Sequence, residues 1–228
     1  MPFPASLRSL VARAVVARAA VALVLLAPAA SAGAQIIRVP PRGLGGEPRL
    51  WASAAVGWAQ IQGFVDGSTS TVWDFGDAAQ FRGSLEARVA RGVTAGVAAT
   101  WARVPLRYGS GAGFVNADAD VTSIVATVHG GGVTGLHQVF DISAGAIIYD
   151  NFKADGGGTL APEKADPDFM FSLGYGFGYA VNSALRVTLV QDAVFAIHQQ
   201  GASDNDNRRT SQQYITRIGV RLGFARGR

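Results

Sequence analysis

Residues Gln212–Phe224 read QQYITRIGVRLGF, and this stretch decides the fold. Successive side chains of a β-strand point to opposite faces. The even positions from Tyr214 to Phe224 are apolar or nearly so, whereas the odd positions include Gln213, Arg217, Arg221 and two glycines. The stretch therefore predicts a strand with one apolar face and one polar face.

The rest of the chain repeats this pattern. Counting the stretch just quoted, eight runs are strand-like: 49–64, 79–90, 93–107, 119–129, 136–150, 167–180, 184–198 and 211–224. Four connections are long and polar: 65–78, 108–118, 151–166 and 199–210. The other connections are short: 91–92, 130–135 and 181–183. Alternating long loops and tight turns are typical of an up-and-down barrel in an outer membrane.

The charged side chains decide which face is outside. An arginine that faces lipid near the membrane midplane costs about 2–4 kcal/mol, whereas in a lumen it can pair with acids. The expected mature chain has only two lysines, Lys153 and Lys164, both in one connection. If the apolar faces of the strands met water, a surface this poor in charge would aggregate. We therefore expect the apolar set to face lipid, and the lumen charge network to comprise Arg82, Glu86, Arg88, Asp141, Arg186, Asp192, Arg217 and Arg221.

The predicted fold is thus all-β, an eight-stranded antiparallel up-and-down transmembrane β-barrel. Aromatic rings at strand ends are typical of the girdles where such barrels meet the lipid–water boundary. The expected girdle residues are Trp58, Phe81, Trp101, Tyr149, Phe169, Tyr179, Phe195, Tyr214 and Phe224.

The N-terminus predicts export. Three arginines precede the apolar run 19–27, which is shorter than the roughly 20 residues of a membrane-spanning helix, and Ala32-Gly33-Ala34 fits a cleavage site. We expect a cleaved signal peptide at 1–34, a short periplasmic leader at 35–48, the barrel at 49–224 and a tail at 225–228. Cleavage lowers the formal charge from +4 to +1, because three arginines and no acid are lost. No nucleic-acid partner is expected, since that requires a clustered basic patch.

These features resemble the small eight-stranded outer-membrane β-barrel proteins of the OmpA, OmpX and OmpW type. The resemblance covers most of residues 49–224. It implies a place in the bacterial outer membrane, among outer-membrane lipid and lipopolysaccharide. Arg217, Gly219, Leu222 and Phe224 match the C-terminal signal that the barrel-assembly machinery recognises in this family. Family members usually end at the aromatic residue, whereas this chain continues for four more residues.

The expected function is a non-enzymatic structural or surface role, with the lumen plugged by charged side chains. An eight-stranded barrel is just wide enough for side chains to fill it, and buried charges need partners. A narrow OmpW-like channel for small or hydrophobic solutes stays open as the alternative. Gly174, Gly176 and Gly178 thin one wall, which either leaves room for long side chains or opens a narrow cavity.

A lipid A-modifying enzyme is the second alternative. It would need a histidine base beside a serine nucleophile. His198 and Ser203 lack a tight spacing and have no glutamate nearby, so no catalytic residue is expected. The Asp- and Asn-rich stretches 116–120 and 204–207 lack the glycine and glutamate of a calcium loop and read as loop tips. No metal and no cofactor are expected.

Overall fold

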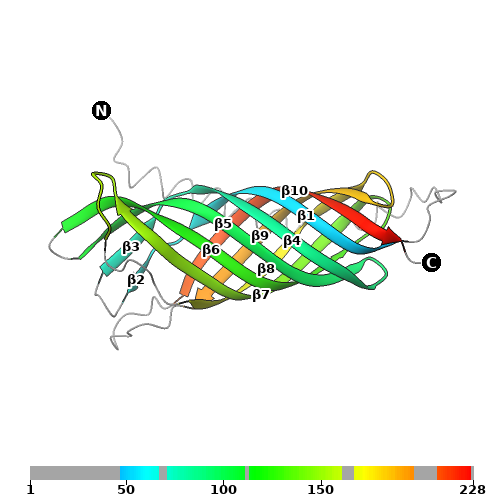
Figure 1. Cartoon of the computed structure of the whole chain (residues 1–228), viewed down its shortest axis with the longest axis horizontal. Coiled ribbons are helices and arrows are strands. Elements are labelled where there is room, and N and C mark those ends of the chain that lie inside the picture. The colour runs from blue at the N-terminus through cyan, green and yellow to red at the C-terminus, as the bar shows by residue number, and fades with distance from the viewer. Residues whose placement is uncertain (1–46, 67–70, 111–112, 161–166, 198–209, 227–228) are drawn as a thin grey trace, which may run out of the picture. The chain divides into compact units, whose positions relative to one another are not determined.

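Ten antiparallel strands make up the described part of the chain in the computed structural model, which covers residues 47–66, 71–110, 113–160, 167–197 and 210–226 (Figure 1). Eight of them form a closed ring: β1 (Pro48–Ile61), β4 (Ala78–Ala90), β5 (Val93–Ser110), β6 (Gly113–Gly131), β7 (Gly135–Ala154), β8 (Asp168–Ala180), β9 (Leu185–Ile197) and β10 (Thr210–Arg226). The strand β10 pairs with β1 from Gln213 to Arg226 and closes the ring. The predicted eight-stranded antiparallel barrel is therefore confirmed.

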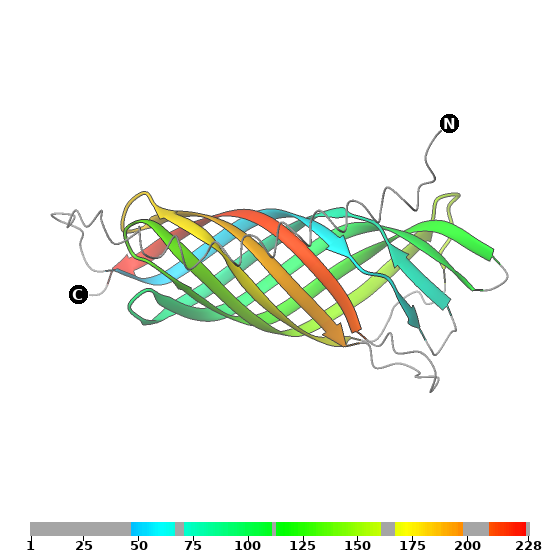
Figure 2. The same ribbon diagram turned by 180° about the vertical axis from the view of Figure 1, so that it is seen from behind.

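The barrel has two different ends (Figures 1 and 2). The turn end carries the three short connections, and the paired residues Pro48 and Arg226 place both ends of the barrel chain there. Gly92 in the first turn has a φ of 72°, and a Cβ on it would lie 2.5 Å from the carbonyl oxygen of Gly131. A glycine is therefore required at this turn. We call the opposite end the loop end.

The strands β5, β6 and β7 extend past the others at the loop end (Figure 1). The predicted loop at 108–118 is wrong, because β5 continues to Ser110 and β6 begins at Gly113. The predicted loop at 65–78 is also wrong in part. It contains β2 (Phe64–Asp66) and β3 (Thr71–Phe75), which pair with each other, and β3 pairs with β5.

The polarity of the two faces reverses along these long strands. On the turn-end part of β6, Ile124 and Val128 point outward and Thr127 points inward. On its loop-end part, Asp118 and Asp120 lie on the outer face, whereas the inward side chains are Ala117, Ala119 and Val121. The strand β5 changes in the same way after Trp101 and β7 after Ile148. Three neighbouring strands thus mark one level at which the outside becomes polar and the inside apolar.

On the turn-end side of this level the outer face is apolar. The most exposed large side chains there include Leu136 at 72%, Leu85 at 63% and Val89 at 63%. Most of the expected girdle residues are exposed on the outer face: Trp58, Phe81, Trp101, Phe169, Tyr179, Tyr214 and Phe224. The prediction for Tyr149 is wrong, because its ring is fully buried in the interior, where inward side chains of β7 are apolar at the loop end. Phe195 is half-buried and stacks on Phe171 with ring centroids 5.0 Å apart.

Candidate functional site in the barrel interior

The interior consists of two layers. The polar layer, toward the turn end, comprises Glu47, Ser53, Arg82, Ser84, Glu86, Arg88, Thr94, Thr127, His129, Asp141, Ser143, Arg186, Asp192, Arg217 and Arg221. The apolar layer, toward the loop end, comprises Ile61, Phe64, Trp73, Phe75, Val104, Leu106, Val121, Ile147, Tyr149 and Phe152. The strands β1, β5, β6 and β7 supply residues to both layers, whereas β2 and β3 supply Phe64, Trp73 and Phe75 to the apolar layer alone.

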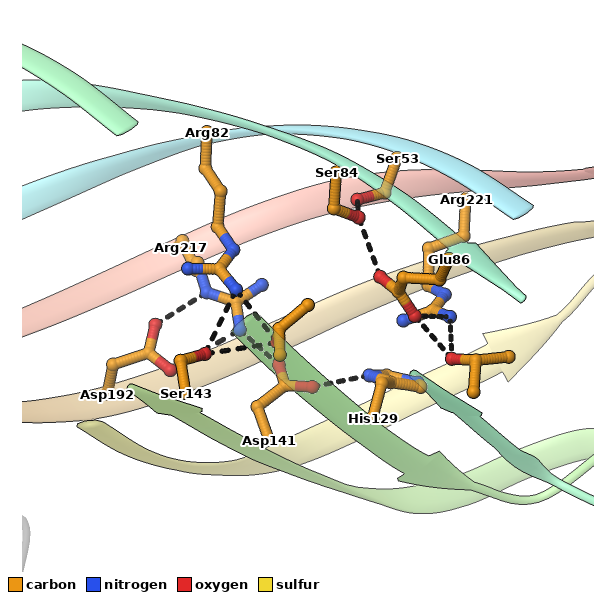
Figure 3. A network of polar contacts seen from close by, with 12 residues as sticks. Ser53, Arg82, Ser84, Glu86, His129, Asp141, Ser143, Asp192, Arg217 and Arg221 are labelled. Carbon is orange, nitrogen blue, oxygen red and sulfur yellow. Dashed lines mark hydrogen bonds and ion pairs between the residues drawn. The ribbon is translucent and has the colours of Figure 1, made fainter. Parts of the chain in front are cut away.

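Arg217 ties opposite walls of the polar layer together (Figure 3). Its Nε donates to Asp192 on the adjacent strand β9 at 2.5 Å, and its Nη2 reaches Asp141 on β7 across the lumen. The second oxygen of Asp141 lies 2.6 Å from Nδ1 of His129 on β6. All three charged side chains are about nine-tenths buried. Such buried charges are held only where partners compensate the loss of water.

A second cluster joins β4, β5 and β10. Arg221 donates to Glu86 at 2.7 Å, and Thr94 donates to the same carboxylate oxygen. The other oxygen of Glu86 accepts a hydrogen bond of 2.6 Å from Ser84, which also contacts Ser53 at 2.5 Å (Figure 3). Every oxygen of this buried carboxylate is therefore engaged.

Arg82 has a different environment from the other arginines. Within the described ranges its partners are two hydroxyls: it donates to Thr127 at 3.2 Å and to Ser143 at 3.3 Å, across the lumen from β4 (Figure 3). The cavity beside it has a volume of about 10 Å³ and is also lined by Arg217 and Arg221. That volume holds about one water-sized species. Side chains of the polar layer thus fill most of the space around Arg82.

At the turn end, a residue that precedes β1 joins the polar layer. Glu47 pairs with Arg186 at 3.1 Å, and its carbonyl oxygen accepts a hydrogen bond of 2.5 Å from Arg88. Trp51 lies behind this pair, with the guanidinium of Arg186 4.3 Å from its ring centroid and that of Arg221 at 5.7 Å. An arginine over a tryptophan face is attracted by the ring quadrupole. Glu47 and Trp51 therefore bound the polar layer on its turn-end side.

The glycines of β8 make room for this layer. A Cβ on Gly174 would lie 2.2 Å from a carboxylate oxygen of Asp192, and one on Gly178 would lie 2.6 Å from Nε2 of His137. A Cβ on Gly176 would lie 2.0 Å from the carbonyl oxygen of Leu189. The sequence left open whether these glycines make room for side chains or open a narrow cavity. In the structure, side chains and backbone of neighbouring strands occupy the space beside them.

The structure places all eight residues of the expected charge network in or beside the polar layer. Arg217, Asp141 and Asp192 form one group, and Arg221 with Glu86 forms another. Arg186 and Arg88 meet through Glu47 at the turn end, and Arg82 joins hydroxyls. The sequence reasoning missed Glu47, Trp51 and His129. Trp51 and His129 occupy inward positions of β1 and β6, whereas Glu47 lies just before β1.

The assembly-signal residues have separate surroundings. Leu222 and Phe224 are about half exposed on the outer face of β10. Gly219 faces inward, where a Cβ would lie 2.9 Å from the Cβ of Ala55 on β1. This glycine allows β10 and β1 to approach at the seam that closes the ring.

The histidines and the acidic side chains bear on catalysis and metal binding. His129 contacts Asp141, but its Nε2 has no hydrogen-bond partner within the described ranges, so no hydroxyl nucleophile is held there. His198 and Ser203 lie outside the described residues. Over the same ranges there is no cluster of three metal-ligating side chains, and no helix is long and apolar enough to cross a membrane.

The closed ring of eight antiparallel strands is the fold of the small outer-membrane β-barrel proteins. Among solved structures, the chain is similar to neisserial surface protein A, with a TM-score of 0.51 and 12% identity, over 77% of this chain and 97% of that chain. It is also similar to the outer membrane protein OprG from Pseudomonas aeruginosa, with a TM-score of 0.50 and 7% identity, over 79% of this chain and 98% of that chain. Both likenesses concern the fold alone. No family model and no curated protein matches the chain.

Proposed function

We propose that the protein is an integral outer-membrane barrel with a closed lumen, and that its role is structural or at the cell surface. The main support for a membrane location is the reversal of polarity along β5, β6 and β7. The apolar outer band runs from Phe81 to Val89 on β4 and from Tyr214 to Phe224 on β10, about nine to eleven residues. A tilted strand of that length matches the thickness of a bilayer's hydrocarbon core. Lipid would surround this band, and lipopolysaccharide the polar outer face at the loop end.

The filled interior supports a plug and not a passage. The polar layer leaves room for about one water-sized species, in a cavity of about 10 Å³. In the apolar layer Trp73, Tyr149 and Phe152 are fully buried, and the centroids of Trp73 and Phe152 lie 5.0 Å apart. Two successive closed layers oppose the flow of ions more strongly than either one alone.

Single-channel recording in planar bilayers tests the closed lumen. The refolded protein should insert without producing discrete conductance steps. Insertion is checked on the same sample by heat-modifiable migration, in which a folded membrane barrel runs differently on a denaturing gel before and after boiling. Regular conductance steps from a sample that is folded by this test would contradict the plug.

A narrow OmpW-like channel for small or hydrophobic solutes is the second candidate, and the apolar layer favours it. An aromatic lining at the loop end would accept apolar molecules after rearrangement of the rings. Uptake of a small apolar dye into liposomes would favour the channel even without ionic conductance. We propose no catalysis, in preference to a lipid A-modifying enzyme. A lipid A acylation or deacylation activity that His198→Ala abolishes would reverse that assignment.

We further propose that the barrel-assembly machinery recognises β10 through Arg217, Gly219, Leu222 and Phe224. The exposed position of Leu222 and Phe224 on the closing strand supports this role. Phe224→Ala should slow delivery of folded barrel in cells while refolding of the purified protein stays normal. Equal loss in both settings would mean that the residue acts on stability alone.

A further inference from the structure

We propose that the turn end of the barrel binds the headgroups of anionic phospholipids, with Arg49 and Arg91 as the main ligands for the phosphate. Both arginines are exposed, and neither side chain has a hydrogen bond, an ion pair or a ring contact within the part of the chain that the structure describes. The inference rests on the proposed membrane placement. Lipopolysaccharide surrounds the loop end there, so the turn end lies in the opposite, phospholipid leaflet.

The turn end carries an excess of positive charge. Its segments are 47–50, 88–94, 129–137, 179–187 and 222–226. They contain one acid, Glu47, against five arginines, a formal excess of four: Arg49, Arg88, Arg91, Arg186 and Arg226. The carboxylate of Glu47 is already engaged, because it binds Arg186 at 3.1 Å and accepts from the backbone N–H of Gly92 at 3.3 Å. Arg88 donates to the carbonyl oxygen of Glu47, which carries no full charge. The chain itself therefore leaves most of this positive charge without a counter-charge.

Strand pairing brings part of this charge together beside the first turn. Leu50 of β1 pairs with Ala87 of β4, which makes Arg49 and Arg88 the next residues on two neighbouring strands. Arg91 follows in the turn that ends β4. Like charges that face each other on neighbouring strands are destabilising. A bound anion at this corner of the barrel would remove that repulsion.

The level of these arginines decides the class of anion. Val89 is 63% exposed and Leu50 is 45% exposed, and both belong to the apolar outer band. Arg91 lies two residues beyond Val89, and Arg49 is the neighbour of Leu50, so the exposed charges begin where the band ends. A phospholipid is suited to this boundary, because its acyl chains contact the band while its phosphate reaches the arginines. Guanidinium groups bind phosphate through paired N–H donors, and anionic headgroups attract basic residues at the membrane surface.

The exposed arginines of the loop end have different surroundings. Nη1 of Arg103 lies 3.0 Å from Asp120, and its Nε lies 3.7 Å from Asp118. The guanidinium of Arg107 lies 4.6 Å from the ring centroid of Phe114. Both already have partners on the chain, so they provide a matched control for the unpartnered pair at the turn end.

Native mass spectrometry of the mature protein released from lipid nanodiscs tests the site. The nanodiscs contain phosphatidylglycerol and phosphatidylcholine in equal amounts, and the retained molecules of each lipid are counted. Each arginine near an anionic surface favours binding by about fivefold. The ratio of retained phosphatidylglycerol to phosphatidylcholine should exceed one in the native protein. It should fall by about 5- to 25-fold in the double variant Arg49→Gln with Arg91→Gln. The control double variant, Arg103→Gln with Arg107→Gln, should keep the native ratio.

Equal retention of the two lipids by the native protein would overturn the proposal. A preference for phosphatidylglycerol that the turn-end double variant keeps would overturn it too, because the lipid would then bind elsewhere. Heat-modifiable migration of the same samples separates this proposal from the proposed function. A chain that does not insert contradicts the membrane placement itself, whereas an inserted barrel without a preference contradicts the headgroup site alone.

If the turn-end double variant does not insert, the salt dependence of the native protein decides. Exposed charges are screened within about 3 Å at 1 M salt. The preference of the native protein for phosphatidylglycerol should therefore disappear when the nanodiscs are equilibrated at about 1 M salt. A preference that stays the same at low and high salt would refute binding through exposed arginines.

Discussion

Replacing Arg217 by glutamine should destabilise the barrel more than any change of a surface charge. Arg217 compensates Asp192 at 2.5 Å and also binds Asp141, and both carboxylates are about nine-tenths buried. Breaking a buried ion pair by removing one partner typically costs about 3–5 kcal/mol, because a buried charge is left without compensation. Here two carboxylates lose their shared partner, so we expect the upper part of that range.

Urea unfolding of the protein in lipid vesicles measures this cost. With a slope of about 1–3 kcal/mol per molar, the midpoint should fall by roughly 1–5 M. The matched control is Arg103→Gln on the outer face, where Arg103 pairs with Asp120 at 3.0 Å and its side chain is 30% exposed. Such surface pairs are worth about 0–1 kcal/mol. Adding Asp141→Asn and Asp192→Asn to Arg217→Gln should recover most of the loss. A cost no larger than that of Arg103→Gln would refute the reasoning.

Three further substitutions probe packing, lipid contact and the seam. Gly176→Ala should cost about 1–3 kcal/mol in urea unfolding, because its Cβ would meet backbone of β9 at 2.0 Å. Gly83→Ala, whose Cβ has its nearest neighbour at 3.9 Å, should be nearly neutral. Leu85→Arg, on the outer face at mid-band, should cost about 2–4 kcal/mol in vesicles, and a neutral effect would argue against lipid there. Gly219→Val should lower refolding yield measured by heat-modifiable migration, whereas an unchanged yield would show that the β1–β10 seam tolerates the larger side chain.

The ring of strands was predictable because most strands keep one polarity along their length. In β10 the residues from Tyr214 to Phe224 cross the apolar band, so alternation with period two identifies both the strand and its outward face. The same holds for β8, where every second residue is aromatic or leucine. In these strands the outward face stays apolar from one end of the band to the other.

The long strands were harder because their polarity reverses. On β6, Asp118 and Asp120 occupy outward positions, and farther along Ile124 and Val128 occupy the same face. Alternation with one constantly apolar face breaks at this point, so the sequence predicts a loop at 108–118. The reversal has a simple physical cause, since the outer face passes from lipid to water while the inner face passes from ion pairs to packed rings.

The site was predictable in its residue types but not in its pairing. Inward arginines and acids follow from parity, whereas the reach of Arg217 across the lumen to Asp141 depends on strand register and tilt. Glu47 escaped prediction because it precedes β1 in what reads as a leader. Trp51 escaped because a tryptophan in a membrane barrel is expected at the outer girdle, and here it is held inside by Arg186.

The apolar outer face and filled interior are tested most directly by quenching tryptophan fluorescence with brominated lipids. The chain has four tryptophans, of which Trp58 and Trp101 are about half exposed outside and Trp51 and Trp73 are buried inside. A variant with Trp51→Phe and Trp73→Phe reports the outer pair, and one with Trp58→Phe and Trp101→Phe reports the inner pair. The outer pair should be strongly quenched by lipids brominated near the headgroup, and the inner pair should be protected. Quenching of the inner pair, or no quenching of the outer pair, would contradict a lipid-embedded barrel with its apolar face outside.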